Sequence, residues 1–349
     1  MGGSFSFSGR SPLTTSISKQ LHLQSDRRLR RFDDIRQLLP DLDNPSPMVR
    51  VSRIVPLPAQ VYLKLEWFNP FGSIKDRAAA YLLAGLEERG LLAGRHLVEA
   101  SSGNTAIAMA ALAALENTPI IITIPDGVPE EKKVLLRMLG AEVWPTPDDL
   151  CPVDNPCDGA IALARSIVES AGGDRYVWPD QYSNPDNVRA HYETTGPEIW
   201  HQTEGQIRTF VAGFGTCGTI SGVGRFLKER DPSIRVVGVE PQATHRLPGL
   251  KSFSESKTPA ILDREVIDEV ILLDDGPAYA MTKRLFREEA LMVGPSTGAV
   301  LEAITRLDSP GLTVGISPDS GFKYTSFFAD GLAEEGIPVD ERRKTEDRS

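Results

Sequence analysis

From about residue 46 onwards, short apolar runs alternate with longer segments in which apolar residues recur at helical spacing. The runs rich in Val, Ile and Leu predict strands at 61–65, 96–99, 119–124, 142–144, 209–212, 235–239 and 313–316. The intervening segments predict helices at 74–89, 104–115, 129–139, 160–171, 198–202, 219–229, 277–290 and 298–307. Strands without polar alternation are buried on both faces, and strands that alternate with helices form parallel sheets. The pattern therefore predicts an α/β fold built on parallel sheets.

The two ends of the chain differ from this alternating region. Residues 1–31 contain seven serines and carry a charge of +5, whereas the rest of the chain carries −15. We expect an N-terminal extension at 1–45, flexible over its first 31 residues or so, and a charged tail at 331–349. Between them the length allows one large α/β domain or two of ordinary size.

Composition excludes several classes of protein. The net charge of −10 argues against nucleic-acid binding, which needs basic surface, and no apolar run is long enough to span a membrane. Three cysteines are too few for a disulfide scaffold, and an odd count suits a reducing compartment. We therefore expect a cytoplasmic protein, with organellar targeting by residues 1–31 as the alternative. The five histidines show no metal-ligand spacing, so we expect no metal.

The sharpest local signal is the loop 213–219, Gly-Phe-Gly-Thr-Cys-Gly-Thr, which follows a predicted strand and opens a helix. Backbone N–H groups at such a helix start favour a bound phosphate. The loop also fits G-x-G-x-x-G, with Glu240 at the end of the next strand, as in NAD-dependent dehydrogenases. Its late place in the chain and the hydroxyls of Thr216 and Thr219 favour a phosphate monoester instead.

Two further segments carry candidate chemistry. Residues 101–105, Ser-Ser-Gly-Asn-Thr, present N–H groups and hydroxyls that suit a carboxylate, although Ser and Asn are also ordinary N-cap residues. Lys75 stands in the first turn of a predicted helix, where the positive end of the helix dipole lowers the pKa of a cation. A lysine of lowered pKa can form a Schiff base, and an ordinary exposed lysine is the alternative.

Together these segments resemble the fold-type II pyridoxal-phosphate-dependent enzymes, most closely the cysteine synthases. The resemblance covers about four-fifths of the chain, from residues 46–50 to about Asp330. It rests on the G-S-x-K-D-R segment around Lys75, the S-G-N-T loop, the G-T-x-G-T loop and Pro-Asp-Ser-Gly at 318–321. It implies two parallel-sheet α/β domains of the tryptophan synthase β-subunit-like fold, at 46–185 and 186–330, with the cofactor in the cleft between them.

The resemblance implies a role for each matching position. Lys75 would hold pyridoxal 5′-phosphate and act as the catalytic base, Asn104 would hydrogen-bond the ring hydroxyl, and Ser320 would face the pyridine nitrogen. The residues implied to cradle the cofactor phosphate are Gly215, Thr216, Cys217, Gly218 and Thr219. The residues implied to bind the substrate carboxylate are Ser101, Ser102, Asn104, Thr105 and Gln181.

The implied reaction replaces the β-substituent of O-acetylserine or O-phosphoserine by sulfide or a sulfur donor, giving L-cysteine through an α-aminoacrylate intermediate. A serine opposite the ring nitrogen softens the electron sink and favours loss of the β-substituent. Lys251 near the mouth of the site is a candidate to hold an anionic leaving group, or else a solvated loop cation. Alternatives are cystathionine β-synthase-type replacement, a serine or threonine dehydratase, the dehydrogenase, and a non-catalytic paralogue. Family members are commonly homodimers, so we expect one here.

Two features depart from the family pattern. Cys217 stands where the family usually has glycine, so a positive φ at this position would be strained. Cys151 and Cys157 lie in a Pro-rich connection that is longer than usual. We expect unpaired loop thiols there, with a redox-active pair as the alternative.

Overall fold

The computed structural model describes residues 31–55, 58–101, 103–146, 159–170, 175–325 and 328. The predictions for Ser102, Cys151, Cys157, the leader before residue 31 and the tail 331–349 lie outside the described residues. The described chain forms a six-stranded sheet in the order β1-β2-β10-β7-β8-β9 and a four-stranded sheet in the order β5-β4-β3-β6. Strand pairs in both sheets are parallel except β1 with β2. The predicted α/β fold with parallel sheets is confirmed.

The strands are short and mostly buried. The larger sheet contains β1 (Met48–Arg50), β2 (Gln60–Leu65), β7 (Ile207–Gly213), β8 (Arg235–Pro241), β9 (Glu269–Leu273) and β10 (Leu312–Ser317). The smaller sheet contains β3 (His96–Ala100), β4 (Ile120–Pro125), β5 (Glu142–Thr146) and β6 (Tyr176–Val177). Central strands such as β4 are buried on both faces, as strands between two helical layers must be.

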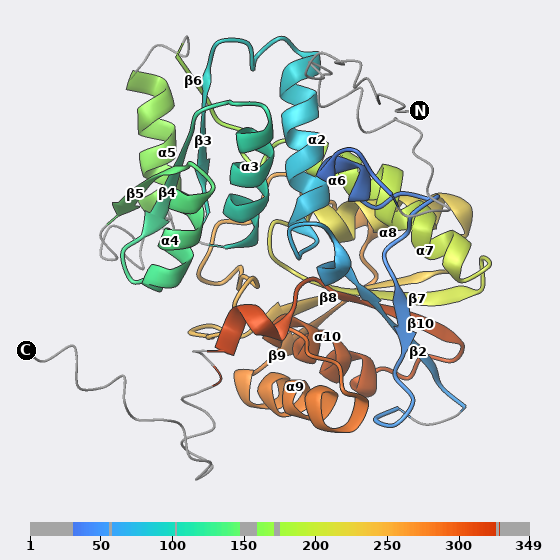
Figure 1. Cartoon of the computed structure of the whole chain (residues 1–349). Coiled ribbons are helices and arrows are strands. Elements are labelled where there is room, and N and C mark those ends of the chain that lie inside the picture. Colours follow the sequence, from blue (N-terminus) through green and yellow to red (C-terminus); the bar gives the residue numbers. More distant parts are fainter. Residues whose placement is uncertain are drawn as a thin grey trace, which may run out of the picture.

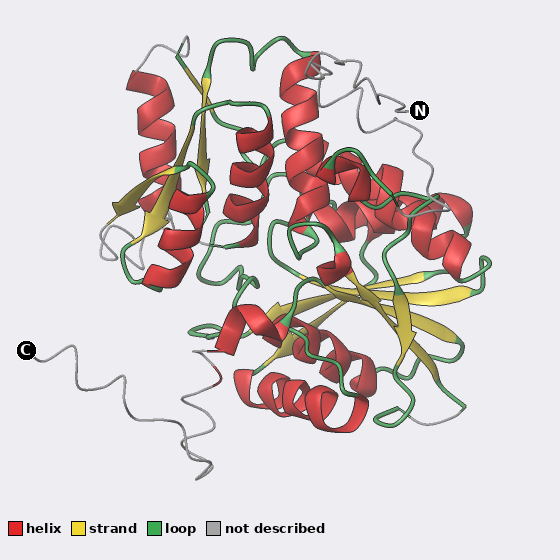
Figure 2. Cartoon of the chain, in the orientation of Figure 1, coloured by secondary structure: helices red, strands yellow, loops and turns green. Residues whose placement is uncertain are grey.

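Helices cover both faces of each sheet (Figure 2). On the larger sheet, one face carries α9 (Asp275–Glu289) and α10 (Pro295–Arg306), and the other carries α7 (Gly196–Gln202) and α8 (Gly218–Arg230). Helix α6 (Asp186–Ala190) packs against α8. On the smaller sheet, α3 (Asn104–Leu115) and α4 (Glu130–Met138) lie opposite α5 (Gly159–Ser170). Helix α2 (Lys75–Glu88) contacts α3 and α6 and lies between the two groups of elements (Figure 1).

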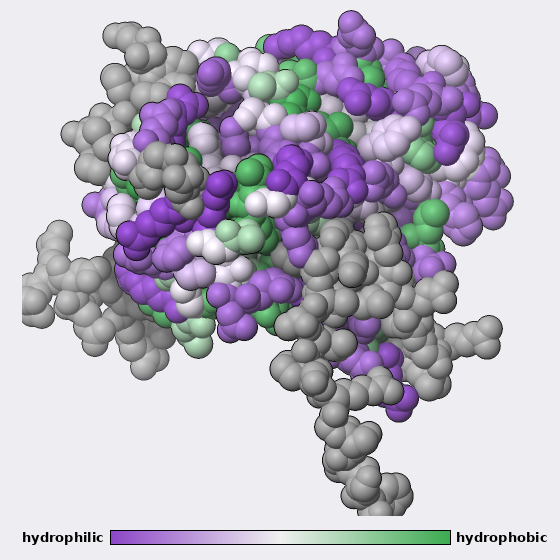
Figure 3. Space-filling view, turned by 90° about the horizontal axis from the view of Figure 1, so that it is seen from above, coloured by the Kyte–Doolittle hydropathy of each residue, from purple (hydrophilic) through white to green (hydrophobic). Residues whose placement is uncertain are grey.

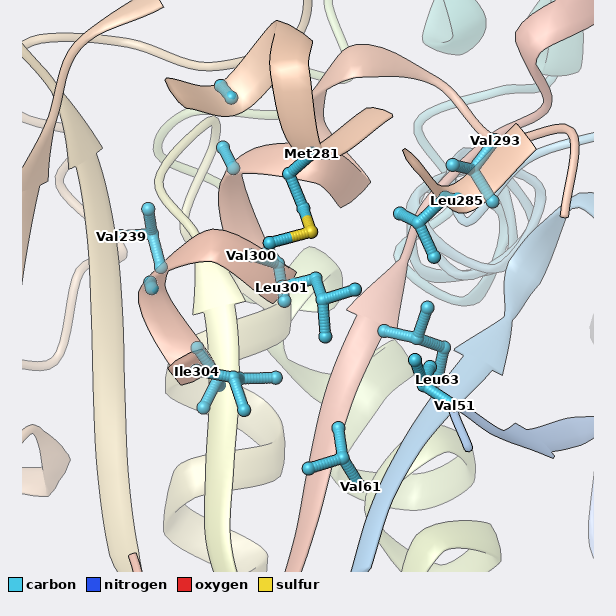
Figure 4. Close-up of a cluster of buried hydrophobic side chains, with 14 of the residues drawn as sticks. Val51, Val61, Leu63, Val239, Met281, Leu285, Val293, Val300, Leu301 and Ile304 are labelled. Atoms are coloured by element: carbon cyan, nitrogen blue, oxygen red, sulfur yellow. The ribbon is translucent and has the colours of Figure 1, made fainter. Parts of the chain in front are cut away.

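The apolar faces of these elements form the cores. Under α9 and α10, β-branched residues of the larger sheet pack against Met281, Leu285 and Leu301 (Figure 4). The helical spacing of apolar residues in α9 and α10 places these side chains on the faces toward the sheet. Polar residues predominate on the molecular face shown in Figure 3. Among the described residues, no helix has the length and apolar character needed to cross a membrane.

Sheet membership differs from the predicted division of the chain in one respect. Strands β1 and β2 come from the segment 46–185, yet β2 pairs with β10 in the larger sheet. A hydrophobic run predicts that a strand exists but does not select its partner, and here the partner is about 250 residues away. The boundary near residue 185 stays a prediction.

Candidate active site

The predicted site segments follow neighbouring strands at their carboxyl ends. In the larger sheet, β2 leads through η2 (Glu66–Phe68) to Lys75, β10 leads to Asp319, and β7 leads to the loop 213–219. Because β2, β10 and β7 are adjacent, these connections meet at one edge of the sheet, where ligands of open α/β sheets bind. In the smaller sheet, the adjacent strands β3 and β6 lead to the loop 101–105 and to Gln181.

One cavity collects most of the predicted cofactor residues. Those that line it are Lys75, Asn104, Gly215, Thr216, Cys217 and Thr219. Lys75 Nζ lies 3.3 Å from Thr216 Oγ1, so the lysine reaches the predicted phosphate loop. Asp319 also lines this cavity, whereas Ser320 does not. The Ser320 hydroxyl instead donates to the Met292 carbonyl at 3.3 Å and accepts from the N–H of Phe322 at 3.2 Å.

The loop at the start of α8 fits a phosphate group. Within the described part of the chain, no backbone hydrogen bond uses the N–H groups of residues 215–220. A Cβ on Gly215 would lie 2.6 Å from the carbonyl oxygen of Gly249, and one on Gly218 would lie 2.1 Å from Asn187 Oδ1. Both glycines are therefore required for this close packing, and free N–H groups at a helix N-terminus favour an anion.

Cys217 adopts the strained backbone conformation expected for a non-glycine residue in this loop. Its φ is +68° and its ψ is 1°, and its side chain is buried in the core beside α8. A left-handed conformation costs a residue with a Cβ about 1–2 kcal/mol. The strain that a positive φ would bring at this position is therefore present.

The amine of Lys75 is easier to deprotonate than that of an exposed lysine. Removal from water lowers its pKa to about 8, and the neighbouring Cys217 and Asp319 only partly oppose this effect. The predicted direction is confirmed, but the principal cause is desolvation rather than the helix dipole. At neutral pH an appreciable fraction of a group with this pKa carries a free lone pair.

The first turn of α2 is anchored by buried charges. Arg77 donates to Glu66 Oε2 at 2.7 Å and Oε1 at 3.0 Å, and to both carboxylate oxygens of Glu198. Lys64 Nζ lies 2.8 Å from Glu198 Oε2. The four side chains have relative exposures of 0 or 1%. Two cations thus balance two anions at the start of the helix that begins with Lys75.

Sequence reasoning missed two residues that hold the threonines of the predicted phosphate loop. The ring nitrogens of His191 lie 2.9 Å from Thr195 Oγ1 and 3.2 Å from Thr219 Oγ1. Asn187 Nδ2 donates to Thr216 Oγ1 at 3.1 Å. Burial lowers the pKa of His191 to about 3, so the ring is neutral near pH 7. A π-helical turn, η4 (His191–Thr195), carries this histidine, and such turns often occur at functional sites.

The predicted substrate-binding residues come together but bond to one another. The Thr105 hydroxyl donates to Gln181 Oε1 at 2.6 Å, and Gln181 Nε2 donates to Glu99 Oε1 at 3.2 Å. The Ser101 hydroxyl accepts from the N–H groups of Gly103 and Ala106, both at 3.3 Å, as a helix-capping residue does. Binding of a substrate carboxylate by these residues stays a prediction.

A second cavity has a volume of about 340 Å³. Leu250 lines the first cavity and Lys251 lines the second, so the two are neighbours along one loop. Lys251 Nζ lies 4.9 Å from the ring centroid of Tyr182. Arg165 and Lys257 also line this cavity, which places three cations around one space.

Comparison with known proteins identifies the family. The family described as "Pyridoxal-phosphate dependent enzyme" matches residues 39–315. A cysteine synthase of Aquifex aeolicus is 39% identical over 82% of this chain and 90% of its own length. A probable cysteine synthase of Bacillus subtilis is 40% identical over 82% of this chain and 95% of its own length.

Solved structures agree with these relatives. An O-ureido-L-serine synthase superposes with a TM-score of 0.79 at 31% identity, covering 89% of this chain and 98% of its own. Isoform 3 of the O-acetylserine sulfhydrylase from Entamoeba histolytica gives a TM-score of 0.77 at 26% identity, covering 87% of this chain and 92% of its own. The family match, the cavity with its lysine and the glycine loop agree, and the chain belongs to the pyridoxal-phosphate-dependent enzymes.

Proposed function

We propose that the chain is a cysteine synthase, which replaces the β-substituent of an activated L-serine by sulfide or a sulfur donor to give L-cysteine. The observation that carries this proposal is the cavity in which Lys75 Nζ lies beside the phosphate loop, at the carboxyl ends of adjacent strands. Relatives at 39% and 40% identity that are named cysteine synthases support the same reaction. Family membership removes the dehydrogenase interpretation of the glycine loop.

Pyridoxal phosphate supplies the electron sink that makes the substrate Cα–H acidic and allows the β-substituent to leave. The residues of the chain bind, orient and move the proton. Lys75, with a pKa of about 8, takes the Cα proton on its amine and holds it at Nζ while the β-substituent departs with its electron pair. The free N–H groups of residues 215–220 hold the cofactor phosphate, and His191 holds the Thr219 hydroxyl in place.

The first test is spectroscopic. Protein purified with pyridoxal phosphate is expected to be yellow, and O-acetylserine or O-phosphoserine is expected to change its absorption band. Lys75→Ala is expected to remove the fraction of the band that borohydride reduces. A colourless protein that gains no absorption from added pyridoxal phosphate would contradict the whole proposal.

The second cavity favours a phosphate leaving group, so we propose O-phosphoserine as the donor. Lys251, Arg165 and Lys257 line this cavity, and none of them forms an ion pair among the described residues. Asp180 and Glu255 also line it, but their carboxylates accept backbone N–H bonds from Tyr182 at 3.2 Å and Thr244 at 2.8 Å. Acetate carries one charge and phosphate close to two, so converging cations discriminate in favour of phosphate.

Donor kinetics test this choice. Lys251→Gln is expected to lower kcat/KM for O-phosphoserine about tenfold and to change kcat/KM for O-acetylserine less than about twofold. Arg208→Gln removes the same charge from an exposed residue paired with Asp231 and is the control. Equal or better turnover of O-acetylserine, unaffected by Lys251→Gln, would end the phosphoserine assignment.

We also propose a homodimer and a cytoplasmic location. Both follow from the resemblance to cysteine synthases and from the cysteine content of the chain. Light scattering coupled to size-exclusion chromatography measures the mass, and a mass near 38.1 kDa, that of one chain, would contradict the dimer. Fractionation of cells that express the full chain tests the location.

A further inference from the structure

Three polar side chains from the loop after β10 surround Asn104, the first residue of α3. Lys323 Nζ donates to Asn104 Oδ1 at 2.7 Å, and Asn104 Nδ2 donates to Asp319 Oδ2 at 2.7 Å. The Tyr324 hydroxyl donates to the same carboxylate oxygen. Asp319 and Tyr324 are only 3% and 7% exposed, so these bonds lie away from bulk water.

The chemistry of the two partners fixes the orientation of the Asn104 amide. An ammonium group has only donors and an ionised carboxylate has only acceptors, so Oδ1 must face Lys323 and Nδ2 must face Asp319. The opposite orientation would place oxygen against oxygen and N–H against N–H. The amide nitrogen has two N–H donors, and Asp319 takes one of them. Asn104 lines the cofactor cavity, so the second donor is available there.

The same loop also holds the segment that carries the catalytic lysine. Lys323 Nζ donates to the Phe71 carbonyl at 3.3 Å, and the N–H of Ile74 donates to the Pro318 carbonyl at 2.8 Å. Ser73 forms an isolated antiparallel bridge with Asp319. Residues 318–323 therefore set the position of Asn104, which follows the smaller sheet, relative to the lysine segment, which follows the larger one.

We propose that Lys323 and Asp319 are positioning residues that orient Asn104, so that an N–H group rather than the amide oxygen meets the ring oxygen of pyridoxal phosphate. This inference rests on the proposed function and on the role of Asn104 in it. The ammonium at the far end of the amide polarises it, which strengthens the N–H donated to the cofactor. Such supporting contacts determine how well a group that touches a cofactor performs.

The experiment compares four single variants of the full chain: Lys323→Met, Lys323→Arg, Asp319→Asn and Lys228→Met. The two readouts are the dissociation constant for pyridoxal phosphate added to apoprotein and the absorption maximum of the bound cofactor. Lys323→Met is expected to weaken cofactor binding about tenfold and to shift the maximum, while Lys323→Arg retains both values. Asp319→Asn replaces a pure acceptor by an amide and is expected to shift the maximum as well. Lys228 pairs with Asp268 at 2.7 Å and bonds to none of Asn104, Asp319 and Tyr324, so Lys228→Met is expected to match the wild type.

A double variant shows whether Lys323 acts through Asn104. In an Asn104→Ala background, Lys323→Met is expected to cause less than a twofold further loss of cofactor affinity. Wild-type affinity and spectrum in both Lys323→Met and Asp319→Asn would overturn the inference, as would the full tenfold loss in the Asn104→Ala background. If the wild-type chain binds no pyridoxal phosphate, the proposed function itself fails, and this outcome is distinct from the other two.

Discussion

Replacing Arg77 tests whether the two buried cations and two buried anions around it stabilise the fold as a balanced set. Arg77→Met keeps most of the side-chain volume but leaves Glu66 and Glu198 with only Lys64 as a cation. Four hydrogen bonds to carboxylate oxygens are lost, in a region whose side chains have relative exposures of 0 or 1%. Removing one partner of a buried ion pair costs about 3–5 kcal/mol, so we expect a loss of this size in the free energy of unfolding.

A second substitution restores the balance of charge. Glu66→Gln added to Arg77→Met leaves one cation, Lys64, beside one anion, Glu198, at 2.8 Å. We therefore expect the double variant to be destabilised by about 1–3 kcal/mol less than the sum of the two single variants. Arg77→Met is also expected to change how the free energy of unfolding depends on pH. Burial alone would raise the pKa of Glu66, but Arg77 and Lys64 outweigh it and lower the pKa to about 2.

The lowered pKa of Glu66 determines whether stability rises or falls with pH. A carboxyl whose pKa is lower in the folded chain contributes stability above its unfolded pKa of about 4.5, and that stability is lost as the pH falls toward 2. Arg77→Met removes this contribution, so the variant is expected to lose less stability between pH 4.5 and 3 than the wild type. Urea unfolding of apoprotein at several pH values measures both quantities. Strict additivity of the two substitutions would refute the balanced-set reasoning, as would a loss below about 1 kcal/mol in Arg77→Met.

Three other predictions follow from single residues. Lys75→Ala is expected to lower kcat by several orders of magnitude with the melting temperature of the apoprotein little changed; substantial turnover would show that the proton is taken elsewhere. His191 has a pKa of about 3 in the folded chain and about 6.5 when unfolded, so stability falls by about 1.4 kcal/mol per pH unit as the pH drops between these values. His191→Gln is expected to flatten that slope in urea titrations, and an unchanged slope would contradict the assignment. Ala290 ends α9 at φ +56° and is exposed, so Ala290→Gly is expected to raise the free energy of unfolding by about 0.5–1 kcal/mol, and a lower melting temperature would contradict this.

The local parts of this structure could be predicted from sequence. The predicted helix at 104–115 has the bounds of α3, and the predicted helix at 219–229 lies within α8 (Gly218–Arg230). Periodicity and glycine-rich connections are local signals, and each acts within a few turns of helix or one strand. The loop 213–219 was identifiable for the same reason, because its glycines, its hydroxyls and the helix start are contiguous.

Most features that the sequence did not predict depend on contacts between segments far apart in the chain. Lys323 and Asn104 are 219 residues apart, and Asn104 and Asp319 are 215 apart, so no local pattern relates them. His191 was noted only as lacking metal-ligand spacing, although it supports Thr219 from 28 residues away. Strands β1, β6 and β9 were also missed. The burial of β1 and β9 alternates instead of being continuous, and the prediction relied on continuously apolar runs. Strand β6 has only two residues, too few to form such a run.

Buried charges lie where the orientation of a side chain must be fixed, because hydrophobic burial does not fix it. Apolar contacts hold α9, α10 and the larger sheet together, but they are non-directional and do not fix the angle of an amide or an amine. Directional hydrogen bonds do, and buried charges are retained at a cost in desolvation that apolar residues would avoid. In the described residues, the Arg77 set lies in the first turn after Lys75, and the Lys323–Asn104–Asp319 chain lies where the two sheets' loops meet. These two sets of charged side chains hold Lys75 and Asn104, whose orientation the proposed reaction requires.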